Sequence, residues 1–461
     1  MISGLAGSVR RIVPLAWPVL VGQLSVLAFS TIDTILVARH ASSDLAALAV
    51  GAAAYITTFV GFMGVVVAIG PIAAQLFGAG RPADAGRQLH QAAWIALGLS
   101  LLGCTLLVFP APFLALSHAS PGMQTRVRPY LLALACALPA SLLFQAFRGF
   151  NNAVSRPKAV MALQLGALAL KLPLSTGLIF GLPALGIPAL GVVGCGIATA
   201  IATWVQLGGA YLVLRRDPFY RPFAIGLARL DPPDRRAIAV QLRQGLPTGA
   251  AILVEVSGFT FMAIFIARLG TTPVAGHQIA ANLVSLLFMV PLAVANGTSV
   301  LVAQRIGARD LADARRLGWH GLALGCGVAA VSGSGLYSLR EGVVGLYTHD
   351  ADVAAAALPL LAFVAVFHVA DAGQTVAAFV LRAWRIATVP LVINATALWG
   401  VGLVGGYQLA FGGSAFVPGA LRGARGFWAA ATLGLVLTAL ALALFQARVM
   451  GRLRRSPAAP A

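Results

Sequence analysis

An all-α polytopic membrane protein is the fold class that this sequence of 461 residues predicts. Its twelve transmembrane helices should form two six-helix lobes related by an internal repeat. Composition, the distribution of basic residues and internal self-similarity predict this fold. The chain is 59% hydrophobic and only 10% charged, with a mean hydropathy of +0.90. Soluble proteins carry about 25% charged residues, so a water-soluble globular enzyme is excluded.

Twelve apolar runs are long enough to cross a bilayer, which takes about 20 helical residues. Each run is separated from the next by a short polar segment, which leaves little chain for anything but connecting loops. In chain order the predicted spans are 14–37, 48–76, 92–117, 130–154, 159–182, 190–214, 245–267, 279–305, 319–347, 354–381, 387–411 and 427–447.

The basic residues predict the orientation of these spans. The net charge is +19 and the pI is near 11.3, but the basic residues lie between apolar runs, so we expect no nucleic-acid partner. Lys171 falls inside a span, and most of the others lie on the side of the N-terminus. Because Lys and Arg accumulate in cytoplasmic loops, we expect a multi-pass membrane protein with both termini in the cytoplasm. The opposite side holds seven: Arg39, Arg126, Arg128, Arg268, Arg340, Arg422 and Arg425.

The two halves of the chain match at a constant offset of 229 positions, which indicates an internal duplication. Pro18 pairs with Pro247, and Asp84 pairs with Asp313. Six spans per half make the repeats parallel, an arrangement known from transporters. We therefore predict an N-lobe of helices 1–6 (residues 1–214), a basic cytoplasmic linker (215–243) and a C-lobe of helices 7–12 with a short basic C-terminal tail (244–461).

Motifs for enzymatic chemistry and for cofactors are missing from the sequence. The four cysteines are isolated in apolar stretches, and the chain has neither an HExxH nor a Gly-Lys-Ser phosphate-binding motif. We expect no enzyme activity and no cofactor. Transport would then be driven by an ion gradient, with H⁺ or Na⁺ as the coupling ion.

Three acidic residues lie within the predicted spans: Asp33, Glu255 and Asp371. Each costs about 2.5–3.5 kcal/mol to insert on biological scales, so we expect them to face a bundle interior or a water-filled cavity. Lys171 is the single basic residue in a span, and we expect it to pair with Asp33. Glu255 and Asp371 lack an obvious basic partner, and such carboxylates would share a proton or bind Na⁺.

Four stretches of the chain resemble motifs of the multidrug and toxic compound extrusion (MATE) transporters, in particular their NorM-type branch. The resemblance covers nearly the whole chain, with the motifs in the expected order and halves. It implies the MATE fold. The stretches are residues 29–34, 74–81, 191–199 and 255–282, the last of which includes Ala275-Gly276-His277-Gln278-Ile279-Ala280.

The resemblance implies a secondary active multidrug antiporter, with a role in antibiotic resistance. By alternating access it would export hydrophobic or cationic, amphiphilic drugs across the bilayer in exchange for H⁺ or Na⁺. Asp33, Glu255 and Asp371 would then be the ion-coupling acids, with Na⁺ a candidate at the last two. An N-lobe network would comprise Lys171, Ser175, Thr199 and Pro18. Residues that could line the cavity or bind substrate are Gln278, Asn282, Phe367, His368, Gln374 and Asp350.

Two departures from the family pattern affect the coupling ion. Lys171 stands where a polar amide is common, and Phe367 stands where a tyrosine is common. An ammonium beside Asp33 would occupy the place of a bound cation, so H⁺ is slightly favoured over Na⁺. The main alternative function is a lipid-linked precursor flippase of a related export family. A flippase needs a cationic cavity, and three acids against one lysine argue against it. Nothing in the sequence requires more than a monomer.

Overall fold

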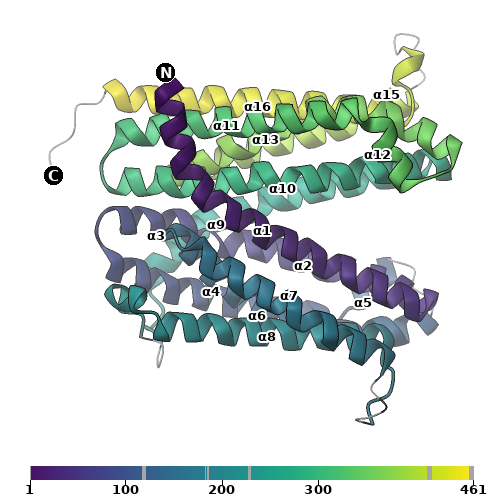
Figure 1. The fold of residues 1–461 in the computed structure, drawn as a ribbon, viewed down its shortest axis with the longest axis horizontal. Helices are drawn as coiled ribbons and strands as arrows, with labels where there is room; N and C mark the ends of the chain where they lie inside the picture. The colour runs from purple at the N-terminus through teal and green to yellow at the C-terminus, as the bar shows by residue number, and fades with distance from the viewer. Residues whose placement is uncertain are drawn as a thin grey trace. The chain divides into compact units, whose positions relative to one another are not determined.

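The computed structural model describes residues 2–116, 121–181, 183, 186–226, 230–412 and 418–455 (Figure 1). Its regular elements are helical over these residues. In chain order they are α1 (Ile2–His40), α2 (Ser42–Val66), α3 (Ile69–Gly78), α4 (Pro82–Val108), α5 (Ala111–Leu116), α6 (Pro121–Ala153), α7 (Pro157–Phe180), α8 (Gly191–Arg216), η2 (Pro218–Phe223), α9 (Arg235–Ala267), α10 (Thr271–Gly307), α11 (Leu311–Ser338), α12 (Arg340–Tyr347), α13 (Ala351–Ala383), α14 (Thr388–Asn394), the π-helix η3 (Ala395–Val404), α15 (Gly405–Phe411), η4 (Gly419–Leu421) and α16 (Ala424–Arg455).

Twelve segments of the described chain are long and apolar enough to cross a membrane, which confirms the predicted number. Two predicted spans were too long at their ends. The span predicted at 92–117 ends at Val108, because Pro110 has no N–H to continue the helix, and α5 follows separately. The span predicted at 319–347 ends at Ser338, and the short helix α12 covers the rest.

The turns after α3 and after α10 show the internal repeat in atomic detail. Backbone N–H groups of Ala79, Gly80 and Arg81 close the first turn, and those of Ala308, Arg309 and Asp310 close the second through carbonyls at the same offset. Gly80 and Arg309 both adopt left-handed φ angles, of 69° and 61°. The two turns therefore share one backbone conformation, although one has glycine and the other an arginine, for which a positive φ is unfavourable.

Packing divides the chain into two compact units. One comprises Met1–Trp17 and Ala250–Ala461, and the other comprises Pro18–Gly249. Each unit thus contains the start of a helix that continues in the other, namely residues 2–17 of α1 and 235–249 of α9. The divisions fall beside Pro18 and Pro247, and proline interrupts the helical hydrogen-bond pattern. The predicted lobes, residues 1–214 and 244–461, group the spans by their order in the sequence, and this grouping stays a prediction. Arg229 and the tail at 456–461 lie outside the described residues.

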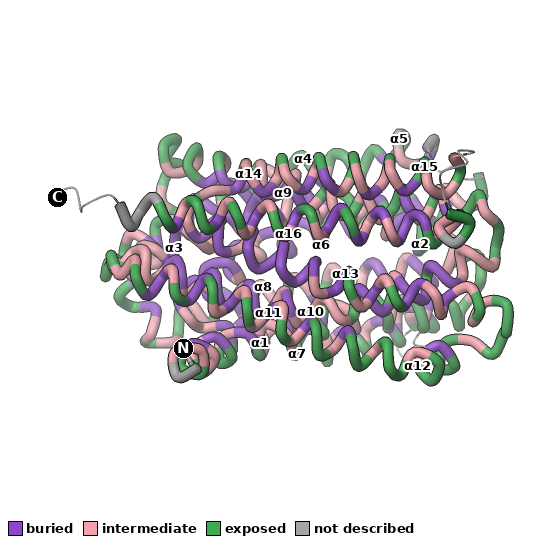
Figure 2. The backbone as a smooth tube through the Cα atoms, turned by 90° about the horizontal axis from the view of Figure 1, so that it is seen from above, coloured by how far each residue is buried: buried purple, intermediate pink, exposed green. Residues whose placement is uncertain are grey.

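Helices within each unit pack through small residues and leave apolar side chains on the outside. In the unit Pro18–Gly249, α6 packs against α2, α4 and α8. In the other unit, α13 packs against α10, α11 and α16. A Cβ at Gly194 would lie 2.4 Å from the Leu178 carbonyl oxygen, so glycine allows α8 to approach α7. Figure 2 shows buried and exposed positions alternating along the helices, and exposed residues include Leu101 and Val331. Such apolar outer faces are those of helices surrounded by lipid.

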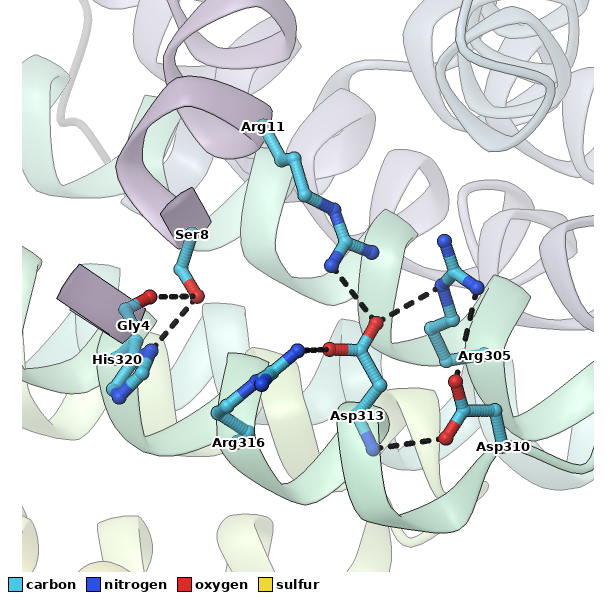
Figure 3. Close-up of polar contacts among 8 residues, drawn as sticks. All are labelled: Gly4, Ser8, Arg11, Arg305, Asp310, Asp313, Arg316 and His320. Carbon is cyan, nitrogen blue, oxygen red and sulfur yellow. Dashed lines mark hydrogen bonds and ion pairs between the residues drawn. The ribbon is translucent and has the colours of Figure 1, made fainter. Parts of the chain in front are cut away.

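The start of α1 is fastened to α11 by two polar contacts (Figure 3). Arg11 Nη1 donates to Asp313 Oδ2 at 2.8 Å, and Ser8 Oγ lies 2.7 Å from His320 Nδ1. Arg305 and Arg316 bind the same aspartate at 3.1 and 2.6 Å. Three guanidinium groups therefore neutralise one buried carboxylate at the first turn of α11.

The short helix η2 of the predicted linker packs against its own unit. Phe223 is buried between the rings of Phe77 and Phe150, and the Tyr220 hydroxyl donates to Asn151 Oδ1 at 2.5 Å. Burial raises the pKa of Tyr220 to about 12. The hydroxyl therefore remains a protonated donor at physiological pH, and this attachment of the linker does not depend on pH. The first residues of the predicted linker are therefore packed against the helices of their own unit.

Candidate functional site

The first group of candidate residues surrounds Lys171 in the unit Pro18–Gly249. Lys171 Nζ donates to Asp33 Oδ2 and to Thr199 Oγ1, both at 2.6 Å. The Lys171 side chain is 1% exposed and that of Asp33 is 14% exposed. The pairing of Lys171 with Asp33 predicted from sequence is therefore present, and it joins α1, α7 and α8.

An aromatic ring and two small side chains complete this Lys171 cluster. Nζ lies 4.1 Å from the centre of the Phe29 ring, a cation–π contact one helical turn before Asp33. Ser175 and Cys195 approach the same carboxylate. The Ser175 hydroxyl and Asp33 Oδ1 are both buried and lack a hydrogen-bond partner of normal geometry among the described residues. The ammonium thus satisfies one carboxylate oxygen and leaves the other free to accept a proton.

Pro18 lies apart from this cluster in the same helix. It is buried, and it is the first residue of the unit Pro18–Gly249. Of the predicted N-lobe network, the structure therefore brings Lys171, Thr199 and Ser175 together around Asp33. Pro18 instead marks the point at which α1 passes from one unit to the other.

The second group lies in α9, α13 and α14 of the other unit and is called here the carboxylate cluster: Glu255, Asp371, Gln374, Arg382 and Asn394. Asp371 is 4% exposed and accepts a hydrogen bond from Gln374 Nε2 at 3.1 Å. Gln374 Oε1 accepts in turn from Asn394 Nδ2 at 3.3 Å. Glu255 interacts electrostatically with Asp371, and the Glu255 residue is only half-buried.

Arg382 is the member of the carboxylate cluster that sequence reasoning missed. The tenth span was predicted to end at 381, which put Arg382 in a loop, but α13 continues to Ala383. Arg382 interacts electrostatically with Glu255, and its guanidinium also lies 4.8 Å from the Phe379 ring centre. With both acids ionised, the cluster carries two negative charges against one positive charge. Asn394 was also missed, because a neutral amide in an apolar run gives a weak signal.

Phe367 and His368 lie on α13 one turn before Asp371 but face different neighbours. The Phe367 ring is buried and packs edge-on against Phe259 and Trp428, with centroids 5.8 and 5.6 Å apart. His368 is also buried, and its Nε2 lies 3.1 Å from Ser332 Oγ on α11. Phe367 therefore belongs to an aromatic group in the hydrophobic core, whereas His368 contributes to the packing of α13 on α11.

Of the remaining predicted cavity residues, two lie on α10 and one lies directly before α13. Gln278 and Asn282 are exposed on α10, and Asn282 Oδ1 accepts from the Tyr347 hydroxyl at 2.8 Å. Asp350 caps α13, because its carboxylate accepts from the backbone N–H groups of Asp352 and Val353 at 2.9 and 3.3 Å. Asp350 thus has a structural task that is independent of any ligand.

The two groups differ in what they can bind. The Lys171 cluster is electrically balanced, whereas the carboxylate cluster, with both acids ionised, has an excess of negative charge among buried and half-buried side chains. Burial of unbalanced charge is costly, so the second cluster favours a cation. Over the part of the chain that the structure describes, no group of three or more His, Cys, Asp or Glu residues could hold a metal ion.

The chain is similar to known proteins in both sequence and fold. Residues 18–176 and 247–408 match the family model described as MatE. The chain is 40% identical to the "Probable multidrug resistance protein NorM" of Aromatoleum aromaticum, over 92% of this chain and 91% of that protein. It is 33% identical to the "Multidrug resistance protein PmpM" of Pseudomonas aeruginosa, over 98% and 94%. The Vibrio cholerae MATE transporter VcmN in the bent form shares the fold, with a TM-score of 0.85, 18% identity and 98% coverage of both chains.

Proposed function

This chain belongs to the MATE family, in its NorM-type branch, and from that premise we propose that it is a secondary active multidrug antiporter. It would export hydrophobic or cationic compounds in exchange for H⁺ or Na⁺ by alternating access. Two relatives that match it over more than nine-tenths of their length are named multidrug resistance proteins. We propose transport rather than enzymatic catalysis, because family membership predicts it.

The observation that carries this proposal is the charge imbalance of the carboxylate cluster. Glu255 and Asp371 interact with each other, and Arg382 supplies a single positive charge nearby. A cation that binds there removes the imbalance, and a cation that leaves restores it. If the two faces of the protein open in states of different affinity, binding of the ion shifts the population between them. This gives ion exchange a physical link to the conformational change.

The Lys171 cluster supports H⁺ as the coupling ion. Lys171 already occupies the cation position beside Asp33 at 2.6 Å, so Na⁺ is not needed there. A proton can bind one carboxylate oxygen, whereas a hard metal cation needs several oxygen ligands. Asp33 Oδ1 is the oxygen that Lys171 leaves free. We therefore favour H⁺ over Na⁺.

The proposed substrate class rests on the family and on the aromatic, apolar surroundings of α9 and α13. Phe259, Phe367 and Trp428 pack on one another in the apolar core of helices that also carry the carboxylate cluster or pack against it. Aromatic faces attract organic cations, and apolar walls bind hydrophobic bodies without demanding one shape. Broad recognition of cationic, amphiphilic drugs is the expected result.

Efflux from proteoliposomes with separately imposed ion gradients tests this function. The purified protein is reconstituted with a fluorescent lipophilic cation, and a pH gradient or a Na⁺ gradient is applied alone. We expect the pH gradient to drive efflux. If only the Na⁺ gradient does so, the coupling ion is Na⁺; if neither drives efflux of any cationic probe, the proposed antiport is wrong.

We also propose that the protein lies in a bacterial inner membrane as a monomer, with both termini in the cytoplasm. The excess of Lys and Arg on the side of the N-terminus supports this orientation. A fluorescent protein that folds only in the cytoplasm, fused to the C-terminus, should fluoresce. A dark fusion in cells with normal levels of the inserted protein would reverse the orientation.

A further inference from the structure

The eleventh membrane crossing, Thr388–Phe411, is interrupted by the π-helix η3. The seven residues of α14 and the seven of α15 flank ten residues of wider winding. At its end, the Gly405 N–H donates to the Gly400 carbonyl, five residues earlier. Its counterpart in the other half, α7 (Pro157–Phe180), has the same length of 24 residues but is an α-helix throughout. π-Helical turns are rare and frequently lie at functional sites.

The residue before the π-helix is linked to Asp371. Asn394 ends α14, is 4% exposed, and donates to Gln374 Oε1 at 3.3 Å. The amide N–H of Gln374 then donates to Asp371 Oδ1 at 3.1 Å. Because Gln374 accepts from Asn394 and donates to Asp371, the orientation of its amide is fixed from both sides. Asn394 therefore holds the Asp371 carboxylate through one intermediate side chain.

The middle of the π-helix is linked to the backbone next to Glu255. Trp399 Nε1 donates to the Val254 carbonyl on α9 at 3.1 Å. The same indole ring lies against Gly258, where a Cβ would be 3.9 Å from its atoms, and the Phe261 ring meets it edge-on at 6.2 Å. Trp399 thus contacts one face of α9 over two turns, starting at the residue that precedes Glu255.

The winding of the helix decides whether both contacts can form. Five residues separate Asn394 from Trp399. At about 100° per residue in an α-helix, they would point about 140° apart. In a helix with i→i+5 bonds the rotation is about 80° per residue, so they point only about 40° apart. The π-helix therefore turns Asn394 toward α13 and Trp399 toward α9 on one side of the crossing, which ordinary α-helical winding would not do.

We propose that the π-helix η3 is a positioning element that sets the spacing between Asp371 and Glu255, with Asn394 and Trp399 as its positioning residues. This inference rests on the proposed ion exchange at the carboxylate cluster. Neither residue needs to touch the coupling ion. The charged groups concerned are the two acids and Arg382, from α9 and α13.

Trp399→Phe tests the inference most directly, because it keeps an aromatic ring and removes the N–H donor. The readout is the coupling-ion concentration that gives half-maximal efflux in proteoliposomes, measured separately from the maximal rate. We expect that concentration to shift about fivefold, the effect of one hydrogen bond worth about 1 kcal/mol, with the maximal rate nearly unchanged. Asn394→Leu should shift it in the same direction. Gly400→Ala, at a position with no atom near the added Cβ, should shift it less, because alanine favours α-helical winding.

Trp319→Phe is the matched control. Trp319 lies on α11, is 39% exposed, and makes no hydrogen bond to any residue that the structure describes. Its substitution should leave the ion dependence unchanged. If Trp399→Phe and Asn394→Leu keep the wild-type half-saturating concentration, or lower only the maximal rate, the positioning role is wrong. Absence of ion-driven efflux from the wild-type protein would instead overturn the proposed function itself.

Discussion

The Lys171 cluster and the carboxylate cluster lie in units that arose by duplication, yet they treat buried charge in opposite ways. In one, the Lys171 ammonium forms an ion pair with Asp33 and donates a hydrogen bond to Thr199. In the other, Glu255 interacts with both Asp371 and Arg382, so two acids stand against one positive charge. The proposed ion exchange would supply the second cluster with a further positive charge, whereas the first is balanced without one.

The two units keep the same backbone frame despite this difference in charge. Ser155 after α6 and Arg385 after α13 both have positive φ, of 62° and 60°, and the backbone N–H of the residue after each closes a turn onto the carbonyl five residues back. With these turns aligned, Asp371 corresponds to Ser141, whose Oγ accepts from the Tyr55 hydroxyl at 3.2 Å. A neutral hydroxyl pair thus stands where the other unit has a carboxylate. A positive φ tolerates only a few residue types, whereas a buried side chain can be a hydroxyl or a carboxylate on the same backbone, so the two units differ in charge but not in frame.

The largest expected effect is loss of transport when either acid of the carboxylate cluster is neutralised. Asp371→Asn and Glu255→Gln each remove one negative charge, so the remaining acid and Arg382 balance without an external cation. Ion-driven drug efflux should fall at least about tenfold, as expected for loss of more than 1.4 kcal/mol of coupling. Resistance of cells to a cationic drug, at matched levels of inserted protein, measures it. Full resistance in cells with either variant would remove that acid from the mechanism.

Disruption of the Lys171 cluster should affect stability more than transport rate. Lys171→Met leaves Asp33 without its partner in a buried site, and breaking one side of a buried ion pair costs about 3 kcal/mol or more. Thermal unfolding in detergent should show a clear loss of stability, and the double variant with Asp33→Asn should recover most of it. If the single variant is as stable as the wild type, the ion pair contributes little.

Lys171→Asn tests whether Lys171 determines which ion drives efflux. It restores the amide that is common in the family at this position and vacates the cation position beside Asp33. Efflux should then become more sensitive to Na⁺ while the carboxylate cluster is unchanged. An ion dependence identical to that of the wild type would show that Lys171 does not determine the ion preference of this unit.

The smallest expected effect concerns the contacts that fasten α1 to α11. Arg11→Ala removes one of three guanidinium groups on Asp313, and Arg11 is 31% exposed, so the cost should be about 1 kcal/mol. In thermal unfolding this is a shift of about 2 °C. The matched control is Arg87→Ala at the equivalent turn, where Asp84 and Arg87 form a more exposed pair; it should cost less. Equal shifts for both variants would contradict a special role for the Arg11 contact.

Much of the fold could be predicted from sequence because apolar length and loop charge are local properties. The number of spans, the repeat and the Lys171–Asp33 pair needed only the spacing of residues and the cost of unpaired charge in lipid. The ends of the third and ninth crossings were missed, because an apolar run continues past the point where Pro110 or Leu339 ends the helix. Arg382 was missed because a charged residue beside an apolar run is normally assigned to a loop, whereas α13 continues through it.

The sequence by itself determined that this chain spans a membrane twelve times as a duplicated transporter carrying three acids and one lysine in its helices. Only the tertiary structure decided that α1 and α9 each divide between two units, that Arg382 joins the carboxylate cluster, and that a π-helix presents Asn394 and Trp399 to different neighbours. Hydrophobicity and charge act on each segment separately and can be summed along the chain. The winding of a helix and the partner of a buried side chain depend on what packs beside them, and residues distant in sequence supply that.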